Sequence, residues 1–213
     1  MTALVWDTPG ERIFQTGVDR GVLYLSSGTA VVWNGLTGVQ ESSNGELKSF
    51  YLNGLKYLEY ISPGDFSATL TAYTFPKEFE SLIGIVEIEP GFNVYEQPSK
   101  SFGLSYRTKI GDDIQGVDLA YLIHILYNVR ANPQSVEYPT IGENIEAMEF
   151  SWDLSSKPST DSTMTWRPSA HFTVDSREVG SEMLSELETV LYGDESTVPS
   201  LPSVDTIRSI LSV

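Results

Sequence analysis

The chain has 213 residues, no cysteine, two histidines and a formal net charge of -16. Its length suits one domain with a buried core, and the lack of cysteine excludes disulfides, thiol nucleophiles and cysteine-bound zinc. A surface this acidic repels nucleic-acid phosphates and anionic membranes, so tight binding to either is not expected.

No apolar run approaches the roughly 18 residues of a membrane span. Residues 1–10 lack the basic start and apolar stretch of a signal peptide, so we expect a product made and kept in a cytoplasm, at least at first.

Short strands dominate the predicted elements. The first two strand-like segments, 21–25 and 30–33, flank a Ser-Ser-Gly turn. Segment 50–60 is aromatic and is broken by Asn53-Gly54, a strong signal for a two-residue turn. Segment 66–75 alternates apolar and polar residues, as a strand with one buried face does. The remaining strand-like segments are 83–88, 101–108, 119–129, 146–154 and 169–174. Eight or nine short strands joined by turns predict a mainly-β sandwich or barrel.

The sequence also predicts two helices. A short one over 76–82 begins at a proline, which is favoured in a first helical turn. A longer one over 181–192 has apolar residues at helical spacing and ends before Gly193, a typical C-terminal stop. The apolar residues of the longer helix are Met183, Leu184, Leu187, Val190 and Leu191.

Two segments are expected to project from the domain. Residues 35–49 are rich in Gly, Ser, Asn and Glu and read as an extended loop. The second projection is the C-terminal arm, residues 194–213, which follows a domain of residues 1–193. The arm is too short for a core of its own, so its apolar residues Ile207, Ile210 and Leu211 must pack on the same chain or on a neighbouring one.

Motifs for nucleotide binding, zinc proteases and serine hydrolases are absent. Asp112, Asp113 and Asp118 lie around a glycine and could bind Ca²⁺, but they lack EF-hand spacing. An acidic hairpin turn is the favoured interpretation.

The two histidines also have an ordinary structural explanation. His171 and Asp175 could form a hydrolase pair with some serine, but at this spacing they simply share one face of a strand. His124 lies inside a predicted strand and is interpreted as a hydrogen-bonded strand histidine. No sequence environment marks one of the 29 acidic residues as a catalytic acid. The sequence thus predicts no catalytic residue, no cofactor and no metal site.

Glycine and aromatic landmarks recur in order along nearly the whole chain. They are Thr16–Tyr24, Val32–Leu36, Tyr51–Tyr57, Ala72–Pro76 with Phe79, Phe102–Thr108 with Ile110–Asp113, His124 with Tyr127-Asn128, Phe150–Trp152, Ala170-His171 with Asp175, Leu191–Gly193 and Pro199–Pro202. With these landmarks the chain resembles the major tail proteins, or tail-tube subunits, of long non-contractile phage tails, especially those of phages of actinobacteria. Two places depart from the pattern: Asn53 stands where Asp is expected, and residues 39–48 match poorly.

The resemblance implies a β-sandwich with a flanking helix, six copies in a ring, and rings stacked into a hollow tube of the virion tail. Implied partners are further copies of the chain, a tape-measure protein, and the proteins that end the tube at its terminator and tip. DNA would pass through without tight binding, and no membrane is involved. An acidic inner wall would serve this passage, with Glu87, Glu89, Glu146 and Glu149 as candidate lining residues.

Other functions stay open at this point. A β-sandwich that binds carbohydrate or a receptor, or that decorates a virion, would group exposed aromatic residues on one face. A hydrolase on a β scaffold would bring carboxylates together in a cleft.

Arg107 forms either an ordinary surface ion pair or a salt bridge to a neighbouring subunit. Trp33 and Trp152 are expected in the core, because both lie within strand patterns.

Overall fold

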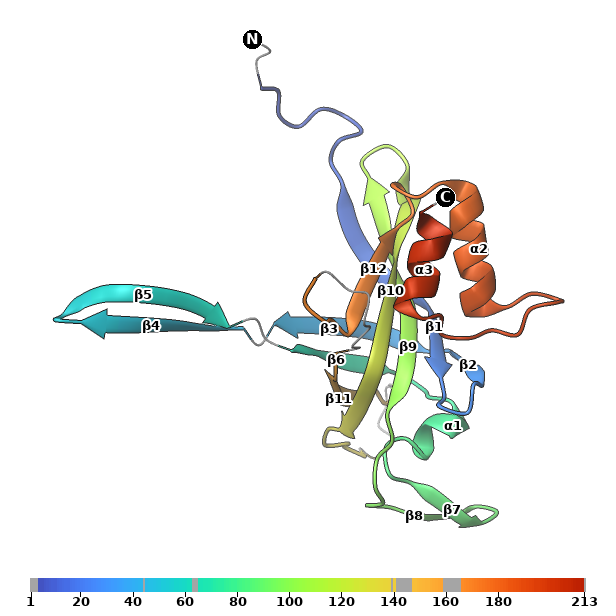
Figure 1. Ribbon diagram of the computed structural model, residues 1–213. Coiled ribbons are helices and arrows are strands. Elements are labelled where there is room, and N and C mark those ends of the chain that lie inside the picture. The colour runs from blue at the N-terminus through green and yellow to red at the C-terminus, as the bar shows by residue number, and fades with distance from the viewer. Residues whose placement is uncertain are drawn as a thin grey trace.

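The computed structural model describes residues 4–43, 45–62, 65–138, 140, 147–158 and 166–212 (Figure 1). Within these residues the chain forms twelve strands and three helices. The strands are β1 (Phe14–Tyr24), β2 (Ala30–Trp33), β3 (Leu36–Ser43), β4 (Glu46–Leu52), β5 (Leu55–Ser62), β6 (Phe66–Ala72), β7 (Val86–Glu89), β8 (Phe92–Val94), β9 (Phe102–Asp112), β10 (Gly116–Pro133), β11 (Phe150–Ser156) and β12 (His171–Asp175). The helices are α1 (Lys77–Glu80), α2 (Ser181–Tyr192) and α3 (Val204–Leu211). Among the described helices, none has the length and apolar content to cross a membrane.

One antiparallel sheet forms the body of the molecule. Its strand order is β2-β1-β9-β10-β11-β6-β3, and β12 pairs with β10 outside this path. β10 is 18 residues long, so it pairs with β9 and β12 along its earlier part and with β11 at its end. The sheet curls until β3, at one end, lies beside β1. The predicted mainly-β fold is confirmed.

The central strands are buried on both sides. Successive residues of a strand point to opposite faces. Ile123 and Ile125 therefore pack against α2 and α3, whereas Leu126 packs against the far half of the curled sheet. Two cores result, one under the helices and one inside the curl, and the long apolar run of β10 follows from this double burial.

The core inside the curl is aromatic. The single turn of α1 places Phe79 in it, with no exposed surface and with its ring centroid 4.4 Å from that of Trp33 and 5.2 Å from that of Trp152. Trp33 also donates a 2.9 Å hydrogen bond from Nε1 to the backbone oxygen of Thr74. The prediction that both tryptophans belong to the core is confirmed. The predicted helix over 76–82 is a shorter one, because only Lys77–Glu80 is helical.

The two longer helices lie side by side on the outer face of the sheet (Figure 1). α2 has the predicted bounds, and it ends at Gly193 with φ of 77°, a backbone conformation that favours glycine. α3 buries Val204, Ile207 and Ile210 in the same core as α2. Of the two possibilities for the apolar end of the arm, the structure places it on its own chain.

The projecting segments differ from the expectation. Residues 36–43 are not a loop but an edge strand of the sheet, whose polar side chains face polar partners on β6, as in the pair Ser42 and Ser67. The long projection is instead the hairpin β4–β5, which extends far from the body (Figure 1). It turns at Asn53 and Gly54 with φ of 50° and 80°, as the sequence predicts.

Candidate functional site

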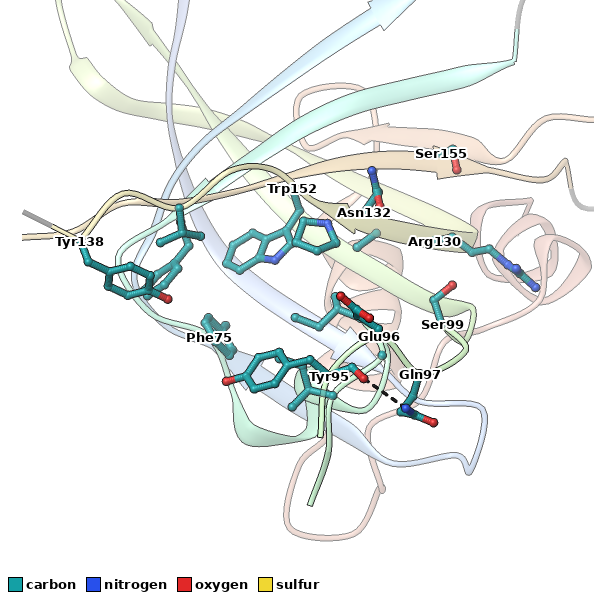
Figure 2. Close-up of a pocket in the computed structure, with 17 residues that line it drawn as sticks. Phe75, Tyr95, Glu96, Gln97, Ser99, Arg130, Asn132, Tyr138, Trp152 and Ser155 are labelled. Carbon is teal, nitrogen blue, oxygen red and sulfur yellow. Dashed lines mark hydrogen bonds between the residues drawn. The ribbon is translucent and has the colours of Figure 1, made fainter. Parts of the chain in front are cut away.

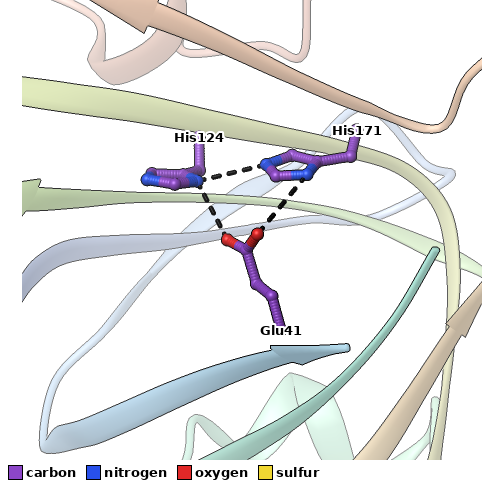
Figure 3. Close-up of side chains that lie close together, drawn as sticks. All are labelled: Glu41, His124 and His171. Carbon is purple, nitrogen blue, oxygen red and sulfur yellow. Dashed lines mark hydrogen bonds and ion pairs between the residues drawn. The ribbon is translucent and has the colours of Figure 1, made fainter. Parts of the chain in front are cut away.

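Three side chains from separate strands meet at one corner of the curled sheet (Figure 3). Glu41 comes from β3, His124 from β10 and His171 from β12. Nδ1 of His124 lies 3.2 Å from Oε1 of Glu41 and 3.1 Å from Nε2 of His171. Nδ1 of His171 lies 3.8 Å from Oε2 of Glu41. We call these three residues the Glu-His-His cluster.

Aromatic rings hold the imidazoles of the cluster in place. The ring of His124 is stacked between those of Tyr106, with centroids 4.6 Å apart, and His171, with centroids 5.3 Å apart. The ring of Phe66 also packs against that of His171, with centroids 4.7 Å apart. The hydroxyl of Tyr106 donates a 2.7 Å hydrogen bond to Oε1 of Glu41. The cluster is thus positioned by packing from β6, β9 and β10.

The surroundings favour an ionised carboxylate at Glu41. The hydrogen bond from His124 is the main reason why the pKa of Glu41 falls to about 2, and the Tyr106 hydroxyl lowers it further. Burial lowers the pKa of His171 from its ordinary value. The cluster therefore offers a negatively charged oxygen donor together with nitrogen lone pairs, the mixed donor set that several transition metals accept.

The sequence alone does not reveal this cluster, because Glu41 falls in a segment whose composition predicts a loop and that matches the family landmarks poorly. The interpretation of His124 as a hydrogen-bonded strand histidine is confirmed, since Thr108 Oγ1 lies 3.0 Å from its Nε2. The available signal was only that both histidines of the chain lie on strands.

The pair His171 and Asp175 does not assemble as a hydrolase pair would require. Asp175 forms a bidentate ion pair with Arg177, at distances down to 2.6 Å, while His171 faces Glu41 and His124. His171 and Asp175 both belong to β12, so their interpretation as two residues of one ordinary strand is confirmed.

The acidic run after β9 forms a hairpin turn, as predicted. The carboxylate of Asp112 accepts hydrogen bonds from the backbone nitrogens of Ile114 and Gln115. Asp113 accepts a 2.9 Å hydrogen bond from the backbone nitrogen of Gly10, and Asp118 lies 3.3 Å from Nζ of Lys109. Each carboxylate thus has its own protein partner.

Arg107 pairs within its own chain and is more enclosed than the expected surface ion pair, whereas a salt bridge to a neighbouring subunit stays a prediction. The strand register places Arg107 opposite Asp19, which accepts hydrogen bonds of 2.9 and 3.0 Å from the guanidinium. Glu188 of α2 lies 3.6 Å away, and the guanidinium stacks over the ring of Tyr121 at 4.3 Å. With 11% of its side chain exposed, Arg107 ties the sheet to the helix layer.

A cleft of about 660 Å³ opens beside the aromatic core (Figure 2). Its wall includes the aromatic side chains of Phe75, Tyr95, Tyr138, Phe150 and Trp152. Of the described residues that line the cleft, Glu96 is the only acidic one. A glycosidase needs two carboxylates across its cleft, and the described part of this one supplies a single carboxylate.

The β4–β5 hairpin exposes an apolar surface on both of its faces. Its exposed apolar side chains are Leu47, Phe50, Tyr51, Leu52, Leu55, Tyr57, Leu58, Tyr60 and Ile61. Adjacent residues such as Tyr57 and Leu58 point to opposite faces, and they are 76% and 53% exposed. In the described chain, β4 and β5 pair only with each other, so both outer edges lack strand partners.

Comparison with known proteins gives only distant structural likenesses. No family model matches the chain, and no curated protein matches its sequence. Among solved structures, the tube-terminating cap of the anti-feeding prophage has a TM-score of 0.41 and 10% identity, over 83% of this chain and 96% of that one. The sheath/tube terminator of an extracellular contractile injection system has a TM-score of 0.30 and 14% identity, over 73% and 96% of the two chains. A chain of the anti-feeding prophage baseplate has a TM-score of 0.32 and 7% identity, over 82% and 97%. All three TM-scores lie below 0.5, so these likenesses carry no weight for the function of this chain.

Proposed function

We propose that this chain is a non-enzymatic structural subunit of a phage-type virion tail, assembled from copies of itself into six-membered rings that stack as a hollow tube. The ordered landmarks of the sequence support this function. The exposed apolar β4–β5 hairpin is the structural observation on which the proposal chiefly rests. A two-stranded hairpin is at best marginally stable in water on its own. Apolar residues on both of its faces, together with two open strand edges, suit a segment that inserts between other copies.

The alternative, a virion protein that binds carbohydrate or a receptor or decorates the capsid, agrees less well with this hairpin. A sugar platform presents aromatic rings on one accessible face. Here aliphatic residues are mixed with aromatic ones, and both faces of the hairpin are apolar. Burial between two protein surfaces accounts for both features.

Within the proposed tube, the partners are further copies, a tape-measure protein and the proteins at the terminator and tip. DNA passes through the lumen without tight binding, and the chain is made in the host cytoplasm. The residues around Val198, which is 77% exposed, are the part of the arm left to reach a neighbour, because α3 packs on its own domain.

An acidic lumen belongs to the same proposal. Glu89 is exposed on β7 and is the strongest candidate for the lining. Glu87 lies 2.6 Å from Lys77, and Glu149 accepts a hydrogen bond from Thr37, so both already have partners. Glu146 lies outside the described residues. A basic inner wall in a reconstruction of the tube would contradict this part of the proposal.

The hairpin provides the test of self-assembly. The double variant Tyr57→Ser and Leu58→Ser changes one exposed residue on each face without altering the charge or the core. We expect purified wild-type protein to form rings and tubes in negative-stain micrographs, and the variant to stay a folded monomer in analytical ultracentrifugation.

A matched control removes exposed apolar residues from the body instead. Ile13→Ser with Ile114→Ser should assemble like the wild type, since these exposed residues lie outside the strands and helices and outside the hairpin. Tubes of normal length from the hairpin variant would refute the role of the hairpin. Single rings that never stack would indicate a protein that ends a tube and would contradict the role of tube subunit.

A further inference from the structure

We propose that Glu41, His124 and His171 bind one Zn²⁺ ion, which ties strand β3 to strands β10 and β12. The cluster unites residues that are distant in sequence, and the strand of Glu41, β3, is hydrogen-bonded to neither β10 nor β12. Two imidazoles and one carboxylate are a recurrent ligand set for zinc, with a fourth position left to water.

The spacing of the donor atoms suits a tetrahedral ion. Bonds of about 2.0–2.1 Å to zinc place neighbouring donors about 3.3–3.4 Å apart. Nδ1 of His124 lies 3.1 Å from the nearer nitrogen of His171 and 3.2 Å from Oε1 of Glu41. A third distance, 3.8 Å, joins the other ring nitrogen of His171, Nδ1, to the other oxygen of Glu41, Oε2. One ligand atom of each residue lies within 4.8 Å of those of the other two, so rotation of the His171 ring and the carboxylate would bring one donor of each residue onto a common centre.

A second layer of contacts already orients the ligands. Zinc-bound histidines usually donate their other ring N–H to an oxygen, which fixes the tautomer. Thr108 Oγ1 lies 3.0 Å from Nε2 of His124. An ion on Nδ1 would replace the proton that Nδ1 shares with Glu41, and the Nε2 proton of the resulting tautomer could be donated to Thr108. The Tyr106 hydroxyl likewise anchors the carboxylate of Glu41.

Access and donor type point to the class of ion. Glu41 is 38% exposed while His124 and His171 are 9% and 18% exposed, so the cluster opens to solvent at the carboxylate. Mg²⁺ and Ca²⁺ prefer sets made only of oxygen donors, whereas two imidazole nitrogens favour zinc and its first-row neighbours. The chain has no cysteine that could compete as a soft ligand.

The ion would act on the root of the projecting hairpin. Glu41 lies two residues before the end of β3, and β4 begins at Glu46. Fixing Glu41 to β10 and β12 restricts the direction in which the hairpin leaves the body. This consequence for assembly rests on the proposed function, whereas binding of the ion does not.

Binding is tested on the full-length chain after treatment with EDTA. Titration with Zn²⁺ against a chromophoric chelator should show equimolar binding, and Co²⁺ should give the visible absorption of a tetrahedral site. Because the sequence has only two histidines, long-range nitrogen NMR reports on both imidazoles without ambiguity. We expect both to change on addition of Zn²⁺.

Variants separate the cluster from adventitious binding to an acidic surface. Glu41→Gln keeps an acceptor for Tyr106 but loses the anionic ligand, and it should weaken Zn²⁺ binding at least about tenfold, as should His171→Asn. Glu149→Gln is the matched control, because it removes the same charge from a carboxylate that also contacts β3 through Thr37. It should bind Zn²⁺ like the wild type.

Unchanged histidine signals in the wild type, or equal affinities in the Glu41 variant and the control, would overturn the proposal and leave a purely hydrogen-bonded cluster. Binding by a monomer that forms no rings would support the zinc site and refute the assembly function. Rings that form with unchanged yield in EDTA would refute the influence of the ion on the hairpin.

Discussion

Arg107 carries a positive charge that is largely enclosed, with 11% of its side chain exposed. Its guanidinium binds both carboxylate oxygens of Asp19, lies near Glu188 and covers the ring of Tyr121. Removal of one partner from such a pair leaves a charge without compensation. Because Asp19 is 34% exposed, solvent screens part of the loss.

We therefore expect Arg107→Lys, which cannot bind in the same bidentate way, to lower the free energy of unfolding by about 2 kcal/mol. Urea denaturation measures this change. The control is Arg177→Lys, in which the guanidinium paired with Asp175 is more exposed than that of Arg107, and a smaller loss is expected there. Equal losses of unfolding free energy at the two sites would show that the burial of Arg107 does not strengthen its ion pair.

At the scale of elements, α3 is part of the domain and not a detachable arm. Val204, Ile207 and Ile210 are each at least 93% buried, given exposures of 5%, 7% and 7%. The segment before the helix also binds the sheet, because the hydroxyl of Tyr127 donates a 2.7 Å hydrogen bond to the backbone oxygen of Pro202.

Truncation after Gly193 should consequently destabilise the monomer by at least about 3 kcal/mol, since each buried apolar side chain contributes about 1.5–3 kcal/mol. Thermal unfolding and binding of a hydrophobic dye to the exposed core of α2 check this expectation. Val198→Ala, on the exposed loop between α2 and α3, should leave the melting temperature unchanged. If the truncated chain were as stable as the full chain, α3 would contribute nothing measurable to the stability of the domain.

At the scale of the whole molecule, every copy in the proposed assembly carries a formal charge of -16. This repulsion opposes the apolar contacts that the β4–β5 hairpin offers. The Debye length falls from about 30 Å at 0.01 M salt to about 8 Å at 0.15 M, so added salt removes repulsion between copies before it affects their contacts.

Self-assembly should accordingly increase as NaCl rises over this range. Sedimentation velocity at fixed protein concentration follows the change, with the hairpin variant Tyr57→Ser and Leu58→Ser as the control that stays monomeric. Dissociation of rings by the same addition of salt would indicate that ion pairs between copies, and not the apolar hairpin, hold the assembly together.

Patterns of a few neighbouring residues were enough to predict the elements that depend only on such short stretches of chain. The Asn53-Gly54 turn, the bounds of α2, the stop at Gly193 and the inward alternation of β6 were all predictable, because turn chemistry and side-chain periodicity act over a few residues. Together they also determined the mainly-β class.

Only the tertiary structure decided which distant residues meet. The polar edge strand β3 reads as a loop, because its polar side chains pair with polar residues of β6 and face solvent. Its curl back toward β1 brings Glu41 to His124 and His171, and the register of β1 against β9 brings Asp19 to Arg107. Sheet curvature and strand register arise from the packing of the whole chain, so no local pattern contains the cluster, the buried ion pair or the direction of the hairpin.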